Sequence, residues 1–499
     1  MKEWTEKERR RIFREEDRQE LRELHETILN SRWRDQFHVQ PVTGLMNDPN
    51  GFSYFNGKWQ LFYQWFPFGG VHGMKHWYRV SSDDLVHWKN EGLALKPELL
   101  YENSGCYSGS GLPEKDTLYL AYTGNAKDYA KNRYQYQLLA KMDRYGRITK
   151  CEKPLIYPNP DYTEHQRDPK LFAYKDRYYI LIGAQNPEKK GVMLLYSANS
   201  PEGTWQFDGE LKVRGYETFG FMCECPCIER IGDKWILLFS PQGIEAEGDL
   251  YQQKYNNVYF IGDFDPEKLE FIPDGPYQEL DRGFDFYAAQ CASQEVYNDA
   301  AVLIGWGSCP DYTTPLTDEI GYSHIQTLPR LLTIEDGKLM QRPVPACESI
   351  KGEVLFEAKE GTILKDTLRG LMPETAVIHL NNPDLTSCEL SLYSGNGKRG
   401  FEISYDRNTK KLTVDRTGML NQFNTEYGTV RRVLLEDGLK SLDVYVDRSC
   451  VEIFVNDGEK VITSRNFPEP TEKLIRMGGS NIDLTIWKAQ RTVEDDFVI

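Results

Sequence analysis

The sequence predicts an all-β protein: a five-bladed β-propeller followed by a C-terminal β-sandwich, with a short N-terminal helical extension. Three observations lead to this fold class. Short apolar segments alternate with turn residues along most of the chain, a motif recurs about every 60 residues in the first two thirds, and the last third has hairpin signals without that period. We expect domains at 1–36, 37–345 and 350–499.

The N-terminal extension, residues 1–32, predicts a helix. Leu21, Leu24 and Ile28 recur at helical spacing, and charged residues occupy most other positions. Such a helix is largely solvated and packs one apolar stripe on the body of the protein or on a partner. The segment lacks the apolar run of a secretory signal, and no later run is long enough to span a bilayer. We therefore expect a cytoplasmic location.

The repeated motif of the next domain is a polar residue that leads into a short strand and a turn. The repeats start at Asp48, Ser108, Asp168, Glu224 and Asp285, with separations of 60, 60, 56 and 61 residues. Five strand–turn–strand units of this length are typical of β-propeller blades, with one four-stranded sheet each. Equivalent positions on the inner strands surround the central axis, so we expect the four carboxylates among them to face one funnel.

The boundary of the last domain is predicted at QRPVPACES (341–349), which has two prolines within three positions. Beyond it, alternating segments and turns return. The stretch 441–464 contains two hairpin signals, at 447–449 and 456–458. A β-sandwich from about 350 to 499 is the natural interpretation.

The composition favours a sugar as ligand over nucleic acid or membrane. Aromatic residues form 13% of the chain, with 30 Tyr and 10 Trp, which suits both β-structure and sugar-binding surfaces. A net charge of −16 repels phosphate backbones and anionic lipid, so we expect neither as a partner. The ten Cys, including those of CECPC (223–227), lack the paired spacing of zinc ligands and are interpreted as reduced structural thiols.

Carboxylates gathered at one point predict glycoside hydrolysis. Like charges close together raise one another's pKa, so one carboxyl group can stay protonated while a neighbour is ionised. Glycosidases need this division, because one carboxylic acid protonates the leaving oxygen while another carboxylate attacks the sugar or activates water. In isolation Asp48, within NDPNG (47–51), would be interpreted as an ordinary turn residue. The ordered motifs described next change that interpretation.

Seven motifs of the predicted propeller resemble, in order, those of glycoside hydrolase family 32, which contains invertases, sucrose-6-phosphate hydrolases and fructan hydrolases. The motifs are NDPNG (47–51), FYQ (62–64), SGS (108–110), RDP (167–169), EC (224–225), DFYA (285–288) and GW (305–306). VEIFVNDGE (451–459) also resembles the C-terminal sandwich of the family, so the resemblance covers about 37–499. It implies retaining hydrolysis of β-fructofuranosides with no metal and no cofactor.

The resemblance also implies a role for each motif residue. Asp48 would be the nucleophile, Glu224 the general acid and then base, and Asp168 the stabiliser of the oxocarbenium-like transition state. Retention implies roughly 5–5.5 Å between the carboxyl groups of Asp48 and Glu224. The residues expected to line the fructose pocket are Asn47, Gln64, Trp77, Ser108, Arg167, Tyr287 and Trp306. Trp65 is expected in the core, and Asp285 is left open between architecture and substrate contact.

The stretches 66–77 and 240–265 are similar to those of sucrose-6-phosphate hydrolases and intracellular invertases. Two positions differ from the family pattern: His72 stands where several members carry Trp, and Arg79 where His is common. Because phosphate is bound through charge-assisted hydrogen bonds, a phosphorylated leaving sugar needs local cations. The candidates are His72, Lys75, His76, Arg79 and Lys254. We therefore expect hydrolysis of sucrose-6-phosphate, with sucrose itself also accepted.

Three alternatives share the propeller architecture. A fructan hydrolase would release product from inulin, levan or short fructo-oligosaccharides. An inverting pentosidase would use one carboxylate as a base and form the opposite anomer. A glycan-binding propeller without catalysis would lack the nucleophile or the acid, and both are present here. The oligomeric state is left open.

Overall fold

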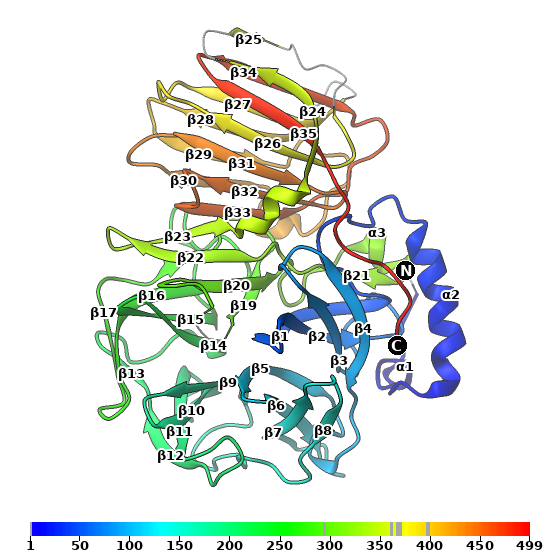
Figure 1. Cartoon of the computed structure of the whole chain (residues 1–499), viewed down its shortest axis with the longest axis vertical. Helices are drawn as coiled ribbons and strands as arrows, with labels where there is room; N and C mark the ends of the chain where they lie inside the picture. Colours follow the sequence, from blue (N-terminus) through cyan, green and yellow to red (C-terminus); the bar gives the residue numbers. More distant parts are fainter. Residues whose placement is uncertain (1, 293–295, 360–362, 366–371, 396–399) are drawn as a thin grey trace.

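The computed structural model describes residues 2–292, 296–359, 363–365, 372–395 and 400–499. Figure 1 shows a ring of small sheets in its lower half, two larger stacked sheets above, and a helix on the outside of the ring. The predicted all-β architecture is confirmed: a five-bladed propeller carries a sandwich and a short helical extension. The exact limits of the three domains stay predictions. Within the described residues, no helix has both the length and the apolar character needed to cross a membrane.

Five separate sheets form the blades, each with its strands paired mainly in chain order. Blade 1 contains β1 (Gly44–Phe55), β2 (Lys58–Phe66), β3 (His76–Ser82) and β4 (Trp88–Leu95). Blade 2 contains β5 (Cys106–Glu114), β6 (Thr117–Lys127), β7 (Arg133–Asp143) and β8 (Ile148–Lys150). Blade 3 contains β9 (Gln166–Tyr174), β10 (Arg177–Gln185), β11 (Gly191–Ala198) and β12 (Gln206–Glu210).

The last two blades depart from the simple four-strand order. Blade 4 contains β13 (Lys212–Val213), β14 (Met222–Ile231), β15 (Lys234–Gln242), β16 (Val258–Asp265), β17 (Glu270–Pro273) and β18 (Gln278–Glu279). Blade 5 contains β19 (Tyr287–Cys291), β20 (Ala301–Trp306), β22 (Arg330–Glu335) and β23 (Lys338–Pro343). Between β20 and β22, the two-residue strand β21 (Tyr322–Ser323) leaves blade 5 and pairs in parallel with β1. This pairing closes the ring, because it joins the last blade to the first.

A β-bulge interrupts the inner strand of every blade. At each bulge two residues of the inner strand oppose one residue of the next strand: 47–48 in β1, 107–108 in β5, 168–169 in β9, 225–226 in β14 and 288–289 in β19. Asp168 and Cys225 have positive φ values of 66° and 46° there. Because a bulge re-aims the side chains of a strand, these positions leave the regular in–out alternation.

The sandwich contains two six-stranded sheets. One sheet contains β24 (Lys351–Ala358), β35 (Asp483–Ala489), β26 (Ala376–Asn381), β31 (Ser441–Val446), β32 (Cys450–Val455) and β33 (Lys460–Arg465). The other contains β25 (Ile363–Lys365), β34 (Leu474–Ser480), β27 (Cys388–Ser394), β28 (Phe401–Asp406), β29 (Lys411–Asp415) and β30 (Val430–Leu434). Buried aliphatic residues such as Ile378, Leu390 and Val444 form the core between the sheets. Short helices lie in the connections: η2 (Leu100–Glu102), α3 (Pro315–Asp318), η3 (Pro345–Ile350) and η4 (Thr425–Tyr427).

The propeller and the sandwich are joined by buried charges as well as apolar contacts. Arg330 of β22 donates to Asp281 at 2.8 Å and to Glu452 of β32 at 3.0 Å, and all three side chains are fully buried. Removing one partner of such a network would leave an unpaired charge in the interior, which is strongly destabilising. The two domains therefore share one continuous packed interface.

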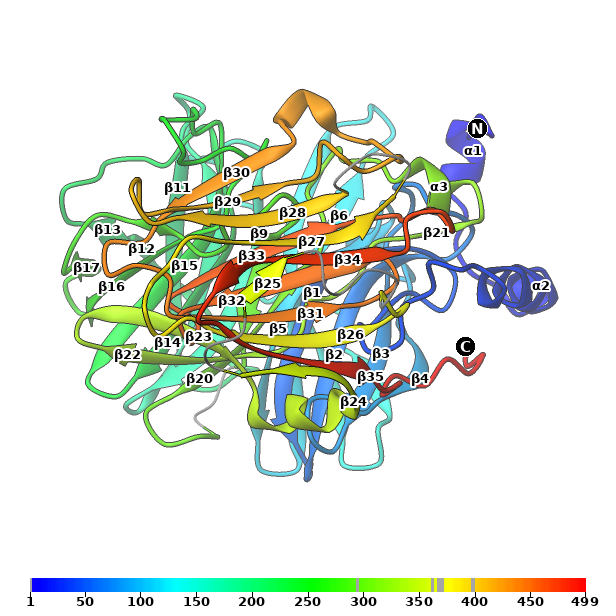
Figure 2. The same cartoon turned by 90° about the horizontal axis from the view of Figure 1, so that it is seen from above.

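The N-terminal extension contains α1 (Glu6–Arg9), η1 (Glu15–Asp17) and α2 (Arg18–Leu29) rather than one continuous helix. Leu21 and Ile28 are fully buried, so the predicted apolar stripe packs on the body of the protein. His25 lies on the same face, where its ring nitrogens contact the backbone oxygens of Val42 and Asp495. Figures 1 and 2 show α2 beside blade 1, with both chain ends near it. The segment after β35 thus returns from the sandwich to the propeller.

Candidate active site

One cavity of about 180 Å³ collects the three carboxylates that the repeat places on different blades. Asp48 comes from β1, Asp168 from β9 and Glu224 from β14. The other residues that line the cavity are Asn47, Gln64, His72, Lys75, Tyr107, Arg167, Tyr287, Trp306 and Pro310. The period in the sequence therefore correctly predicted that side chains more than 50 residues apart meet at one place.

Asp48 is held by three hydrogen-bond donors. Asn47 Nδ2 donates to Oδ1 at 3.1 Å and Gln64 Nε2 donates to Oδ2 at 3.2 Å. The Ser108 hydroxyl also donates to Oδ2, and accepts a hydrogen bond from Gln64. Burial raises the pKa of Asp48 above its ordinary value, and the hydrogen bonds from Ser108 and Asn47 act in the opposite direction. These donors fix the orientation of the carboxylate and favour its ionised form.

Glu224 is surrounded by donors on both oxygens. Arg167 donates to Oε1 from Nε at 3.2 Å and from Nη2 at 2.5 Å. Gln242 Nε2 donates to Oε2 at 2.9 Å, and the Tyr287 hydroxyl donates to the same oxygen at 2.7 Å. The hydroxyl of Tyr287 also lies 3.3 Å from the backbone oxygen of Ser240. It can therefore donate to Ser240 and accept from Glu224 when that carboxyl group carries a proton.

Asp168 occupies the bulge of β9 and faces both other carboxylates. Its backbone N–H donates to Thr123 Oγ1 at 2.9 Å, and its Oδ2 accepts from the N–H of Cys225 at 3.1 Å. Burial raises the pKa of Asp168 to about 7; Arg167 opposes this shift, while Glu224 and Asp48 add to it. Burial thus raises the pKa of both Asp48 and Asp168, so these two carboxyl groups keep a proton to higher pH than free carboxyl groups do.

Two basic residues, Lys75 and His72, form one side of the cavity. Lys75 Nζ donates to Asn47 Oδ1 at 2.6 Å and lies 3.0 Å from His72 Nδ1. Burial lowers the pKa of Lys75 to about 7, and burial and the neighbouring Lys75 lower the pKa of His72. The Trp306 ring stands edge-on to His72 at 6.2 Å. Its buried Nε1 has no hydrogen-bond partner in the described part of the chain, so it is available to a hydroxyl of a bound sugar.

Two family models match the chain: the N-terminal domain of glycosyl hydrolases family 32 over residues 38–343, and the family 32 C-terminal domain over residues 350–488. The chain belongs to glycoside hydrolase family 32. This family 32 glycosidase is 38% identical to a sucrose-6-phosphate hydrolase of Staphylococcus xylosus, with 94% of each chain covered. It is 35% identical to the enzyme of that name from Lactococcus lactis subsp. lactis, with 98% of this chain and 100% of the relative covered.

Solved structures agree with the family assignment. The structure of sucrose-6-phosphate hydrolase from Lactobacillus gasseri has a TM-score of 0.91 and 34% identity, and covers 98% of this chain and 100% of its own. A β-fructofuranosidase of Bombyx mori in complex with sucrose has a TM-score of 0.83 and 31% identity, with 97% of this chain and 100% of its own covered. The fold of the family 32 glycosidase is therefore shared over nearly its full length.

Two residues predicted to line the fructose pocket of this family 32 glycosidase lie behind it instead. Trp77 is fully buried and donates from Nε1 to the backbone oxygen of Tyr107 at 3.0 Å. Tyr107 itself lines the cavity, so Trp77 supports a lining residue. Ser108 is also fully buried and does not line the cavity; its hydroxyl donates to Asp48 Oδ2. For Ser108, the bulge at 107–108 explains the difference, since it exchanges which of the two side chains faces the cavity.

Three of the predicted cationic residues lie outside the cavity. His76 is buried under the N-terminal extension, where its Nε2 accepts from the N–H of Phe13 at 3.1 Å. Arg79 donates to Gln60 at 2.9 Å and lines a separate cavity of blade 1. Lys254 forms an ion pair with Asp311 at 2.8 Å. The structure therefore brings only His72 and Lys75 of that set to the carboxylates.

Trp65, expected in the core, and Asp285, left open between architecture and substrate contact, both make their contacts inside the protein. Trp65 is fully buried in the core, as predicted. Asp285 is also buried, and its carboxylate accepts from Arg416 Nη1 at 3.0 Å and from the backbone N–H of Arg465 at 2.9 Å. Both partners belong to the sandwich domain. The fifth repeat therefore departs from the expected funnel and joins the two domains.

Sequence reasoning missed four residues of the site: Tyr107, Gln242, Cys225 and Pro310. Tyr107 is the direct neighbour of the motif SGS, and Cys225 belongs to the motif EC but was given no role; both lie in bulges, which no sequence period reveals. The Cys225 thiol lies 3.8 Å from Asp48 Oδ2, and its backbone N–H donates to Asp168. This cysteine therefore contacts two carboxylates of the site rather than only filling the core. Gln242 ends β15 in a run of turn-forming residues, which gave no signal of its own.

Proposed function

We propose that this family 32 glycosidase is a retaining β-fructofuranosidase that hydrolyses sucrose-6-phosphate and also accepts sucrose. One observation carries the proposal: Asp48, Asp168 and Glu224 meet in one cavity of a chain that is 34–38% identical to several sucrose-6-phosphate hydrolases. Two carboxyl groups with different environments are what double displacement at a sugar requires.

In the first step, Asp48 attacks C2 of the fructosyl unit. The bond between C2 and the glycosidic oxygen breaks, its electron pair stays on that oxygen, and Glu224 supplies the proton. The products are a fructosyl ester on Asp48 and free glucose 6-phosphate. The Tyr287 hydroxyl supports both states of Glu224, because it can accept from the acid and donate to the carboxylate.

In the second step, Glu224 acts as a base. It takes a proton from water, the water oxygen bonds to C2, and the ester electron pair returns to Asp48. Two inversions at C2 retain its configuration. Asp168 binds fructose hydroxyls and stabilises the positive charge that develops on the ring, while Arg167 orients Glu224 through two hydrogen bonds. In both steps, Asn47 and Gln64 keep Asp48 in place.

The leaving sugar is proposed to lie on the side of His72 and Lys75, two basic residues of the cavity. A phosphate on that sugar is bound better by the hydrogen-bond donors of basic residues than by the acidic surface elsewhere. We propose a cytoplasmic location for the enzyme, because a charged sugar phosphate does not cross a membrane unaided.

The proposal is tested by comparing wild type with Asp48→Asn and Glu224→Gln on sucrose-6-phosphate, sucrose and inulin. Each variant is expected to lose roughly 10³-fold or more in kcat. Asp116→Asn, at an exposed turn of blade 2, is the matched control and is expected to retain activity. NMR of the first-formed fructose distinguishes retention from inversion. Faster release from inulin than from either sucrose would instead support a fructan hydrolase, and an inverted first anomer would exclude the mechanism.

A further inference from the structure

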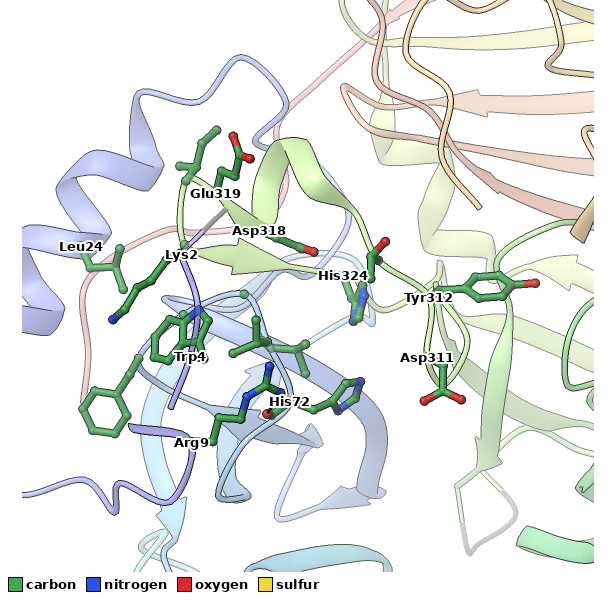
Figure 3. Close-up of a pocket in the computed structure, with 18 residues that line it drawn as sticks. Lys2, Trp4, Arg9, Leu24, His72, Asp311, Tyr312, Asp318, Glu319 and His324 are labelled. Carbon is green, nitrogen blue, oxygen red and sulfur yellow. Dashed lines mark hydrogen bonds between the residues drawn. The ribbon is translucent and has the colours of Figure 1, made fainter. Parts of the chain in front are cut away.

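A second cavity, of about 560 Å³, adjoins the active-site cavity (Figure 3). The two cavities share His72, and Pro310 of the first is followed in the chain by Asp311 of the second. His324 lines the second cavity, and its ring contacts at 5.2 Å, in a tilted arrangement, the ring of Trp306, which lines the first. The two cavities therefore meet at His72.

The outer wall of this second cavity comes from residues 2–13, which we call the N-terminal strap. The Trp4 ring packs edge-on against Phe66 at 5.8 Å, and a Cβ on Gly69 would lie 2.2 Å from the same ring. The Arg9 backbone oxygen accepts from the N–H of Met74 at 2.7 Å. These contacts fasten the strap to the loop between β2 and β3, the loop that presents His72 and Lys75 to the active site.

Arg9 is the available cation of the second cavity. Its Nη1 donates to the His72 backbone oxygen at 3.2 Å, and it has no carboxylate partner among the residues that the structure describes. Lys2, the other basic residue of the strap in this cavity, is already paired with Glu8 at 2.9 Å. Figure 3 shows the Arg9 side chain next to His72, the residue that also lines the active-site cavity. A guanidinium in this position presents free N–H donors to an anion.

The acidic residues of the cavity do not occupy this position. Asp311 is neutralised by Lys254 at 2.8 Å. Asp318 accepts from Thr314 and from the Ser323 hydroxyl, and burial raises its pKa. Glu319 lies at the far end of the cavity from Arg9 (Figure 3). The part of the cavity next to His72 is therefore suited to a negatively charged group.

The volume of the active-site cavity also indicates that the leaving sugar reaches the second cavity. The active-site cavity of about 180 Å³ is small for a disaccharide, because ligand sites usually enclose roughly 300–1,000 Å³. With the fructosyl unit at the carboxylates, the leaving sugar extends beyond this cavity, and the second cavity, which shares His72 with it, offers the space. We propose, on the basis of the function proposed above, that the phosphate of the leaving sugar binds in the second cavity, where Arg9 of the N-terminal strap is its ligand. Arginine suits this role, since its planar fork binds two phosphate oxygens at once.

The test compares Arg9→Gln and Arg9→Lys with the wild-type enzyme. The measured quantity is the ratio of kcat/KM for sucrose-6-phosphate to kcat/KM for sucrose, with the inhibition constant of glucose 6-phosphate as a second readout. Arg9→Gln is expected to lower the ratio and weaken inhibition by about 10–100-fold, and Arg9→Lys by less, because it keeps the charge without the fork. Arg10→Gln is the matched control, since Arg10 pairs with Glu6 at 3.4 Å and does not line the cavity.

Two results would overturn different parts of the proposal. A wild-type ratio near one would show that the enzyme does not favour the phosphorylated substrate, which removes the substrate assignment and the phosphate site together. A high wild-type ratio that survives in Arg9→Gln would retain the substrate but reject Arg9 as the phosphate ligand. Equal losses in Arg9→Gln and Arg10→Gln would indicate that the strap acts only through its general packing.

Discussion

The Ser108 hydroxyl opposes the burial that raises the pKa of Asp48, and Ser108→Ala should make this visible in the pH dependence of the reaction. The hydroxyl is fully buried, donates to Asp48 Oδ2 and accepts from Gln64. It does not line the cavity. The substitution therefore removes a donor from the proposed nucleophile without removing a surface that the substrate touches.

The size of the effect follows from the kind of hydrogen bond that is lost. A hydrogen bond to a charged group contributes about 1.5–3 kcal/mol, and one pKa unit corresponds to about 1.4 kcal/mol. Because the hydroxyl favours the ionised carboxylate, its loss should raise the pKa of Asp48 by about 1–2 units above its already elevated value. Asp48 must be ionised to attack, so the acid limb of kcat/KM should move to higher pH by the same amount.

The assay is kcat/KM for sucrose across the acid limb in wild type, Ser108→Ala and Ser110→Ala. Ser110 is the matched control, because it is also buried in β5 and also makes two hydrogen bonds, with Pro169 O and Leu171 N at 2.7 Å each. Its loss should lower Tm but leave the acid limb in place. An unmoved limb in Ser108→Ala, or an equal shift in both variants, would refute the assigned role of Ser108.

Three further predictions concern neighbouring groups. Tyr287→Phe removes a donor at 2.7 Å from Glu224, so kcat should fall about tenfold; unchanged kcat in steady-state assays would contradict this role. Trp306→Phe removes an N–H that has no partner in the described part of the chain, so thermal unfolding should be unaffected while KM rises about 3–10-fold. Asp285→Ala leaves Arg416 buried and unpaired, and denaturant unfolding should show a loss of about 3–5 kcal/mol with KM unchanged. A raised KM would return Asp285 to the substrate site.

Much of the fold could be predicted from the sequence because propeller blades are nearly independent repeats. Each blade needs the same strand–turn–strand pattern, so the period of Asp48, Ser108, Asp168 and Glu224 carries information about positions in space. The apolar stripe of α2 was equally visible, since Leu21 and Ile28 are both buried. The break between α1 and η1 was not predicted, because propensity alone sets helix ends poorly.

The individual roles inside the site were harder to predict. Trp77 and Ser108 were expected to contact the sugar, but both are buried and do not line the cavity. Tyr107, which was not among the predicted residues, lines it instead. These assignments depend on a bulge, which shifts the side-chain alternation by one residue and leaves no periodic signal. His76 and Arg79 were likewise grouped with His72 by proximity in sequence, but a strand points alternate side chains to opposite faces.

The sequence alone encodes a polar residue at the head of each inner strand. This recurrence brings three carboxylates together in one cavity. A repeat carries this information because every blade obeys the same local rules. The contacts that each carboxylate makes depend on the tertiary structure. Asp285 turns to Arg416 of the sandwich, and Arg9 reaches His72 from a strap far from it in the chain. Contacts between distant segments depend on how the domains pack against each other, and no local pattern encodes that packing.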